Sequence, residues 1–142
     1  MNIPYLKAEG FEADDIIATL TINARKNGYR SYICSKDKDL EQLLDEDSVI
    51  FDIVSQKVTT ADILKKKKGI IPKQVPDFLA LTGDKVDNIP GIPGIGPRTA
   101  MQLLNTYGTL DDIYLKLEEV NSNLRYKLKQ FHEQAILARE LV

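Results

Sequence analysis

The amino-acid sequence predicts an α/β protein with few strands, followed by a segment that is helical throughout. Between residues 12 and 54, a helical apolar pattern, a β-rich run, a short leucine-containing helix and a second β-rich run follow one another, which is the order of a parallel α/β unit. From residue 59 onward the pattern is that of helices. Since only two strands are visible, we expect an incomplete parallel sheet, with one part at residues 1–58 and a helical part at 59–142.

The elements of the first part follow from periodicity and residue type. Apolar residues recur at helical spacing from Ile16 to Ala24, acidic residues precede them and Asn27-Gly28 follows, which predicts a helix over residues 12–26. Residues 29–35 and 48–54 are rich in β-branched and aromatic residues and are expected to be strands. Leu40, Leu43 and Leu44 indicate a short helix between them.

The second part is divided by capping and breaking residues. Thr60 and Asp62 resemble a capping box, which predicts a helix that ends near Gly69. Pro76 suits the first turn of a helix that Gly83 ends. Further helices are expected over residues 97–105 and 109–118, and one final amphipathic helix contains Leu124, Leu128, Phe131 and Ala135.

Composition places the chain among ordinary globular proteins. Its 142 residues are 43% hydrophobic and 28% charged. No apolar run approaches the roughly 20 residues that cross a membrane, and no signal-peptide pattern opens the chain. The single Cys34 has no internal disulfide partner, which favours a reducing, cytoplasmic setting, and we expect it to be a small core residue. The net charge is −2, but residues 1–64 carry −5 and residues 65–142 carry +3, a weak indication of metal binding beside phosphate binding.

The stretch at residues 82–100 has the features of a phosphate-binding turn. Isoleucines fall at every third position with Pro and Gly between them, which suits a compact turn that buries apolar side chains and exposes backbone. Gly94-Ile95-Gly96 carries little side-chain cover, and Pro97 suits the first position of a helix. The free N–H groups of that first turn, with Arg98 beside them, would bind an anion.

Seven carboxylates form three clusters at the ends of predicted elements: Glu12, Asp14 and Asp15; Asp37 and Asp39; Asp84 and Asp87. The i,i+3 spacing of the first and last clusters allows each pair to share a helical face. Oxygen ligands without His or Cys favour Mg²⁺ or Mn²⁺ over zinc, and two such ions would serve phosphodiester hydrolysis.

Each cluster also has a structural interpretation. Acidic residues at helix starts are common caps, which is the more frequent role for Asp14 or Asp15 taken singly. An Asp-x-Asp pair such as Asp37 and Asp39 is usually a solvated turn, and Asp84 after a glycine can simply begin a helix. The prediction of metal-dependent phosphodiester chemistry therefore depends on the three clusters together with the hairpin.

Three stretches in order along the chain resemble a known family. They are Glu12-Ala13-Asp14-Asp15, the run from Ser35 to Leu43, and the run from Leu81 to Ala100. These are similar to the bacterial 5′ nucleases, the 5′→3′ exonuclease domains of DNA polymerase I, which are related to flap endonucleases. The resemblance implies a PIN-like α/β nuclease core, followed by helices with a helix–hairpin–helix of the three-turn type at about residues 82–104. It also implies cleavage of 5′ flaps and 5′ ends of DNA with two divalent metals, Mg²⁺ or Mn²⁺, in replication and repair.

Carried over by position, the resemblance implies a role for each cluster. Glu12, Asp14 and Asp15 would line one metal site directly or through water, and the other site would use Asp37, Asp39, Asp84 and Asp87. The hairpin would hold the duplex backbone, often through a K⁺ on its carbonyls, by a set of residues that comprises Gly91, Ile92, Gly94, Ile95, Gly96, Arg98 and Thr99. Such contacts position DNA without reading its sequence.

The sequence departs from the family at its start. The family has further aspartates on an opening strand and basic residues in a helical arch, and neither precedes Met1 here. The chain therefore resembles the C-terminal portion of the nuclease, and we expect it to cleave DNA poorly by itself. The resemblance implies a monomer in the bacterial cytoplasm, associated with the nucleoid and not with a membrane. It also implies continuity with an N-terminal nuclease segment and, in polymerase members, with a polymerase region.

Two other functions compete with this interpretation. One is a non-catalytic module that binds duplex DNA with its helix–hairpin–helix alone. The other is a metal-dependent ribonuclease of the same broad core, which would have no need of the hairpin. Metal binding by the acidic clusters separates the nuclease from the binding module.

Overall fold

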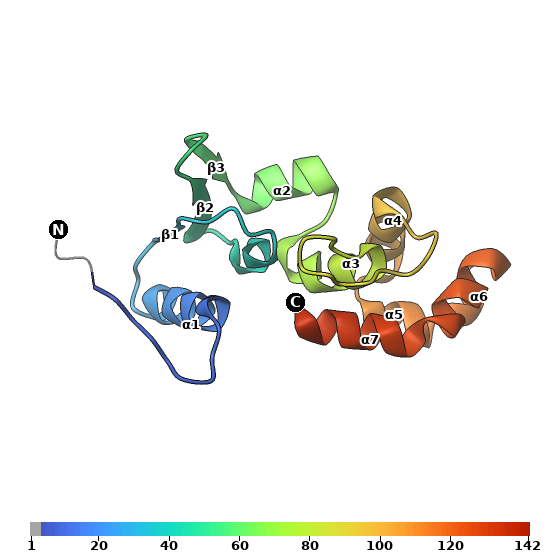
Figure 1. Ribbon diagram of the computed structural model, residues 1–142. Helices are drawn as coiled ribbons and strands as arrows, with labels where there is room; N and C mark the ends of the chain where they lie inside the picture. The colour runs from blue at the N-terminus through green and yellow to red at the C-terminus, as the bar shows by residue number, and fades with distance from the viewer. Residues whose placement is uncertain (1–3) are drawn as a thin grey trace. The chain divides into compact units, whose positions relative to one another are not determined.

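The computed structural model describes residues 4–142, which form two compact units, one ending at Ile63 and one running from Leu64 to Val142. The sequence-based boundary lies at residues 58 and 59. The secondary structure is drawn in Figure 1. Each described helix is too short or too polar to span a bilayer.

The first unit is a small α/β unit. It contains α1 (Ala13–Lys26), β1 (Ser31–Ile33), the 3-10 helix η1 (Asp39–Leu43), β2 (Ser48–Asp52) and β3 (Lys57–Thr59). The strands lie in the order β1-β2-β3, with β1 and β2 parallel and Tyr32 opposite Val49. The α1 helix packs against β1 and η1, and Ile33, Leu40, Leu44 and Ile50 form the buried core.

The strand β3 was not predicted from the sequence. Because it pairs antiparallel with β2, the sheet is mixed and not wholly parallel. The strand predicted to reach residue 54 ends at Asp52, whose carboxylate accepts hydrogen bonds from the backbone N–H groups of Val54 and Ser55. Gln56 adopts a φ of +54°, which turns the chain back so that Val58 pairs antiparallel with Phe51. An aspartate that accepts hydrogen bonds from the backbone two and three residues later is typical of a turn. The β-rich composition of residues 48–54 outweighed this signal at Asp52 in the sequence-based prediction.

Cys34 is exposed, so its predicted place in the core is wrong. The β1 strand ends at Ile33, which is buried, and Cys34 lies beyond the last position that pairs with β2. The local alternation of burial explains the difference, because neighbouring strand residues face opposite sides.

The second unit is helical. The α2 helix (Ala61–Lys68) leads into it, and it contains the 3-10 helices η2 (Pro72–Gln74) and η3 (Leu117–Glu119) together with α3 (Val75–Thr82), α4 (Pro97–Tyr107), α5 (Leu110–Leu115), α6 (Ser122–Gln130) and α7 (His132–Leu141). The α3 helix is its centre, because it is buried along most of its length and packs against both α4 and α7.

The expected final helix is in fact two helices. Phe131 adopts φ −112° and ψ 24° between α6 and α7, outside the helical region, although the apolar spacing continues across the break. Periodicity alone cannot reveal such a break, because the residues on both sides still face the core. The α5 helix also ends earlier than expected, at Leu115, and η3 follows it.

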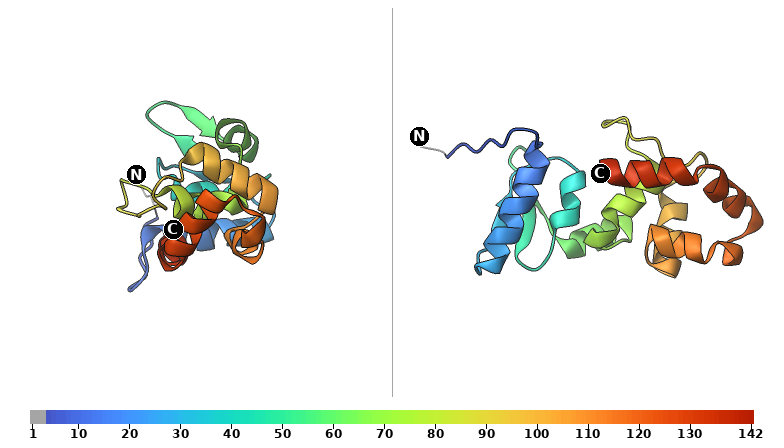
Figure 2. Two further views of the ribbon diagram at one scale, coloured as in Figure 1. Left: turned by 90° about the vertical axis from the view of Figure 1, so that its right-hand side faces the viewer. Right: turned by 90° about the horizontal axis from the view of Figure 1, so that it is seen from below.

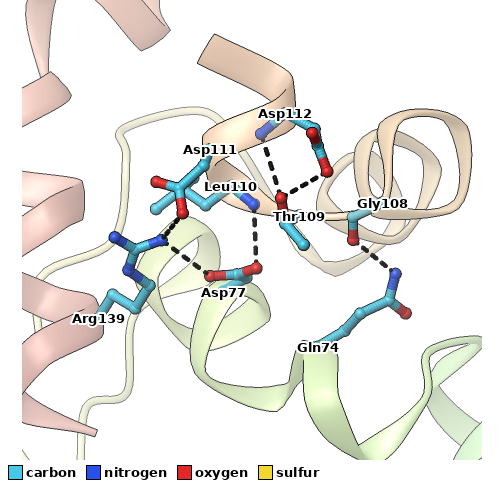
Figure 3. Close-up of polar contacts among 8 residues, drawn as sticks. All are labelled: Gln74, Asp77, Gly108, Thr109, Leu110, Asp111, Asp112 and Arg139. Atoms are coloured by element: carbon cyan, nitrogen blue, oxygen red, sulfur yellow. Dashed lines mark hydrogen bonds and ion pairs between the residues drawn. The ribbon is translucent and has the colours of Figure 1, made fainter. Parts of the chain in front are cut away.

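A buried carboxylate on α3 joins three helices (Figure 3). Asp77 Oδ2 accepts a hydrogen bond of 2.9 Å from the Leu110 N–H, and therefore caps the start of α5 from another element. Asp77 Oδ1 lies 3.7 Å from Arg139 Nη1 on α7, and Arg139 also binds Asp111 at 2.9 Å. Burial raises the pKa of the Asp77 carboxyl, although the Leu110 N–H and Arg139 oppose this shift.

Gln74, the last residue of η2 and the N-cap of α3, makes a second connection to the end of α4. Its Nε2 donates to the carbonyl oxygens of Leu104 at 3.0 Å and Gly108 at 2.8 Å. Leu104 lies in the last turn of α4 and Gly108 is the C-cap of that helix, so both hydrogen bonds hold its C-terminal end. Asp77 and Gln74 therefore fix the positions of α4 and α5 relative to α3.

We expect Asp77→Ala to lower the free energy of unfolding by about 2 kcal/mol, because it removes a buried cap and an ion-pair partner. Asp111→Ala is the matched control and should cost less than about 1 kcal/mol, since the Asp111 side chain is 64% exposed and that of Asp77 only 9%. Urea unfolding followed by circular dichroism measures both. Equal losses would show that Asp77 does not hold the helices together.

Candidate functional site

Asp84 and Asp87 lie in a tight loop directly after α3. The backbones of Asp84 and Ile89 bond to each other in both directions, at 3.0 and 2.8 Å, and close the loop. Asp84 is only 5% exposed, and its Oδ1 accepts a hydrogen bond of 2.8 Å from the Val86 N–H. Oxygens of Asp84 and Asp87 lie within 4.8 Å of each other, close enough to share one divalent ion. The two aspartates thus share a loop, and not the helical face that their spacing predicted.

Two glycines make this loop possible. A Cβ on Gly83 would collide with the backbone of Gly91, and a Cβ on Gly91 would collide with the backbones of Thr82 and Gly83. Gly83 also has a φ of +76°, and the Ile92 N–H donates to the Leu81 carbonyl at 2.9 Å. The end of α3 and the start of the following hairpin are therefore in direct backbone contact.

The hairpin, residues 91–96, buries its apolar side chains and leaves backbone exposed. Ile89, Ile92 and Ile95 are all buried, as their spacing predicts. The Ile95 N–H donates to the Ile92 carbonyl at 2.9 Å, and Gly94 occupies the turn with a φ of +79°. Because Ile92 and Ile95 are buried, only their backbone groups can face a ligand.

The hairpin leads into an open helix start. Gly96 is the N-cap of α4 and Pro97 is its first residue, and in the described part of the chain no side chain caps this end. A Cβ on Gly96 would meet no atom within 4 Å. Arg98 is exposed beside the N–H groups of the first turn, so an anion has both free donors and a cation within reach.

The first unit carries the other two acidic clusters at element boundaries. Asp37 accepts a hydrogen bond of 3.0 Å from the Asp39 N–H, and its own N–H donates to Ser35 Oγ, which makes a turn after β1. Glu12 caps α1, and its N–H donates to the Asp15 carboxylate at 3.0 Å. The capping interpretation of Asp15 is therefore correct as far as local structure goes.

The two first-unit clusters lie at separate element boundaries. Among its described residues, that unit has no group of three carboxylates close enough to hold one ion. Asp37 and Asp39 share one turn, and the cluster of Glu12, Asp14 and Asp15 forms the start of α1. Their assignment as metal ligands stays a prediction.

Sequence reasoning missed the residues that hold the site in place. Gln74 precedes the apolar run of α3, and Asp77 lies within it. A carboxylate among apolar positions could have indicated that Asp77 has a buried partner. Gln134 on α7 donates to the Gly91 carbonyl at 2.9 Å, and Lys127 on α6 lies against Gly94. No local pattern indicates either contact, because each joins residues far apart in the chain.

Family models match the chain over its full length. The model described as the 5′-3′ exonuclease N-terminal resolvase-like domain matches residues 1–69, and the model described as the 5′-3′ exonuclease C-terminal SAM fold matches residues 70–142. The chain belongs to the 5′-3′ exonuclease family. The prediction that it resembles only a C-terminal portion is therefore wrong in one respect, because its first 69 residues match the family's N-terminal domain.

Curated relatives agree with the family. A 5′-3′ exonuclease of Aquifex aeolicus is 44% identical over 83% of this chain and 41% of its own length. A 5′-3′ exonuclease of Buchnera aphidicola is 39% identical over 99% of this chain and 52% of its own. DNA polymerase I of Caldicellulosiruptor bescii is 39% identical over 99% of this chain and 17% of its own. The chain thus spans about half or less of the relatives that it matches.

Solved structures share the fold. A bacteriophage T5 5′-exonuclease variant gives a TM-score of 0.89 at 22% identity, covering 99% of this chain and 58% of that one. A T5 flap endonuclease, solved as a pseudo-enzyme–product complex with DNA and metal ions, gives the same TM-score and identity over 99% of this chain and 53% of that one. At this identity the likeness concerns the α/β fold.

We expect Gly91→Ala to destabilise the protein by about 2 kcal/mol or more, because its Cβ would overlap the Thr82 and Gly83 backbone. Gly96→Ala, in open space with an extended backbone, should change stability by no more than about 0.5 kcal/mol. Urea unfolding of the two variants compares them directly. A stable Gly91→Ala protein would contradict the close backbone contact.

Proposed function

We propose that this chain is part of a structure-specific 5′ nuclease, a 5′→3′ exonuclease and 5′ flap endonuclease that hydrolyses DNA phosphodiesters in replication and repair. Its family membership and the fold that it shares with a T5 flap endonuclease support the reaction class. The observation that carries the proposal is the pair of Asp84 and Asp87 directly before the hairpin. This order joins a carboxylate site to a phosphate-binding turn within a few residues.

The carboxylates fit hard divalent cations. Asp84 is buried close to Asp87, so the two negative charges repel each other unless a cation neutralises them. We propose that Asp84 and Asp87 bind Mg²⁺ or Mn²⁺ together with Asp37 and Asp39 of the first unit. In this proposal Glu12, Asp14 and Asp15 serve a second ion. Two such ions would activate a water and stabilise the leaving oxygen of the phosphodiester.

The hairpin would hold the duplex. We propose that residues 82–104 form a helix–hairpin–helix of the three-turn type, and that the backbone of Gly91 and the exposed backbone of Gly94 and Gly96 contact DNA phosphates. Arg98 and Thr99 lie in the first turn of α4, where an anion finds free N–H groups. A K⁺ ion on the hairpin carbonyls stays a prediction. Because such contacts do not read bases, specificity would be for a 5′ end or flap on a duplex.

The 142 residues alone should cleave little. We propose that a complete two-metal site uses further ligands, since the chain spans about half or less of the relatives that it matches. We propose that residues 1–58 belong to a PIN-like nuclease core and residues 59–142 to a DNA-binding segment. Continuity with further nuclease sequence and with a polymerase is proposed from the relatives, several of which are DNA polymerase I proteins. A monomer in the bacterial cytoplasm stays a prediction.

A duplex-binding module without catalysis is the second candidate. It is favoured by the fact that the hairpin, the start of α4 and their supporting helices all lie in the second unit. Such a module would bind duplex DNA with no dependence on the carboxylates. Metal titration therefore separates the two functions.

We expect Asp84→Asn and Asp87→Asn each to weaken Mn²⁺ binding at least about tenfold, because each removes a carboxylate ligand from an all-oxygen site. Glu119→Gln, an exposed carboxylate in the same unit, is the matched control and should leave binding unchanged. Isothermal titration calorimetry measures the affinities. The double variant Asp37→Asn/Asp39→Asn tests the first-unit ligands, and unchanged affinity there would remove only their assignment. Equal, weak binding by all proteins would favour the duplex-binding module.

We expect Arg98→Ala and Gly96→Val to weaken binding to a blunt 20-base-pair duplex, the first by removing a cation and the second by placing methyl groups before the open helix start. Gly96 suits this test better than Gly94, whose φ of +79° makes any larger residue strained. Lys116→Ala, an exposed lysine at the end of α5, is the control for charge. Fluorescence anisotropy without divalent ions reports binding, and affinities equal to that of Lys116→Ala would refute the phosphate-binding role.

A further inference from the structure

A lysine from α6 lies against the tip of the hairpin. Gly94 occupies the turn, and a Cβ added there would collide with the Nζ of Lys127 and crowd its Cε. The ammonium group therefore lies directly beside the backbone that the hairpin exposes. Lys127 cannot be inferred from the hairpin sequence, because α6 comes after α4 and α5 in the chain.

Lys127 differs from the other two cations of its helix. Arg125 and Lys129 both pair with Glu118, Lys129 at 3.0 Å, so each of these cations already shares a carboxylate within the protein. In the part of the chain that the structure describes, no carboxylate forms an ion pair with Lys127, and residues 88–100 contain no acidic residue. The Lys127 charge is thus available to an anion that approaches the hairpin.

The position of Lys127 is set by the helices around it. Leu128 is fully buried and its carbonyl accepts a hydrogen bond of 3.1 Å from Tyr114, which fixes the rotation of α6. On α7, Gln134 donates to the Gly91 carbonyl at 2.9 Å, so the two C-terminal helices contact the start and the tip of the hairpin. Figure 2 shows the loop between α3 and α4 passing beside α7. The lysine stem is partly buried, which lowers the entropy that a phosphate contact must overcome.

We propose that Lys127 is a phosphate-binding residue of the hairpin, supplied by α6, and that it contacts the sugar–phosphate backbone of duplex DNA together with Arg98. The proposal rests on the proposed function and extends it to a helix outside the helix–hairpin–helix. It assigns to α6 and α7 the role of holding a cation at the hairpin, besides that of completing the core. The contact is electrostatic and independent of base sequence.

The test is the salt dependence of duplex binding by the 142-residue chain. Anisotropy titrations of a labelled 20-base-pair duplex, without divalent ions and between 50 and 200 mM salt, give the slope of log K against log salt. We expect Lys127→Gln to reduce the magnitude of this slope by about 0.9 and to weaken binding about tenfold at 50 mM salt. Lys127→Arg should restore both, because it keeps the charge.

Lys129→Gln is the matched control, since it makes the same change two residues away on the same helix, at a lysine paired with Glu118. It should keep the wild-type slope. Lys127→Met keeps the apolar stem, so a loss in that variant too assigns the effect to charge and not to packing. If Arg98→Ala weakens binding while Lys127→Gln behaves like Lys129→Gln, the role of Lys127 is overturned and the hairpin proposal stands. If the wild-type chain shows no salt-dependent duplex binding, both proposals are overturned.

Discussion

The contact between the Gly83 and Gly91 backbones is the constraint on which the candidate site depends. Neither glycine has room for a Cβ, so the chain can leave α3, carry Asp84 and Asp87 through a closed loop and return to the same place. The hairpin then begins where the acidic loop ends. A larger residue at either position would push the two backbone segments apart and displace the carboxylates from the hairpin.

In the second unit, side chains that are far apart in the sequence also contact one another and hold the helices in place. Asp77 caps α5 and contacts Arg139 on α7, while Gln74 bonds to the end of α4. Because Asp77 lies on α3 and Gln74 is its N-cap, the helix that leads into the acidic loop also positions the helices around the hairpin. Polar contacts of this kind, buried at Asp77 and partly buried at Gln74 and Arg139, are satisfied only in one arrangement of the helices, so they specify geometry as well as contribute stability.

Cations of the second unit that form ion pairs differ in position from those at the hairpin. Arg125 and Lys129 share the Glu118 carboxylate, and Arg139 pairs with Asp77 and Asp111, so these ion pairs join elements of the fold. Arg98 and Lys127 are left at the hairpin, which has no acidic residue of its own. Net charge conceals this division, because a phosphate responds to local charge at the surface that it approaches.

The sequence by itself determined the α/β class, most helices, the buried isoleucines of the hairpin and the family, because these depend on periodicity, on Gly and Pro positions and on motifs within a few residues. Only the tertiary structure decided the antiparallel β3, the break at Phe131 and the exposure of Cys34. It alone also brought Lys127 to Gly94 and Asp77 to the start of α5. Those features depend on pairing between residues far apart in the chain, which no local pattern records.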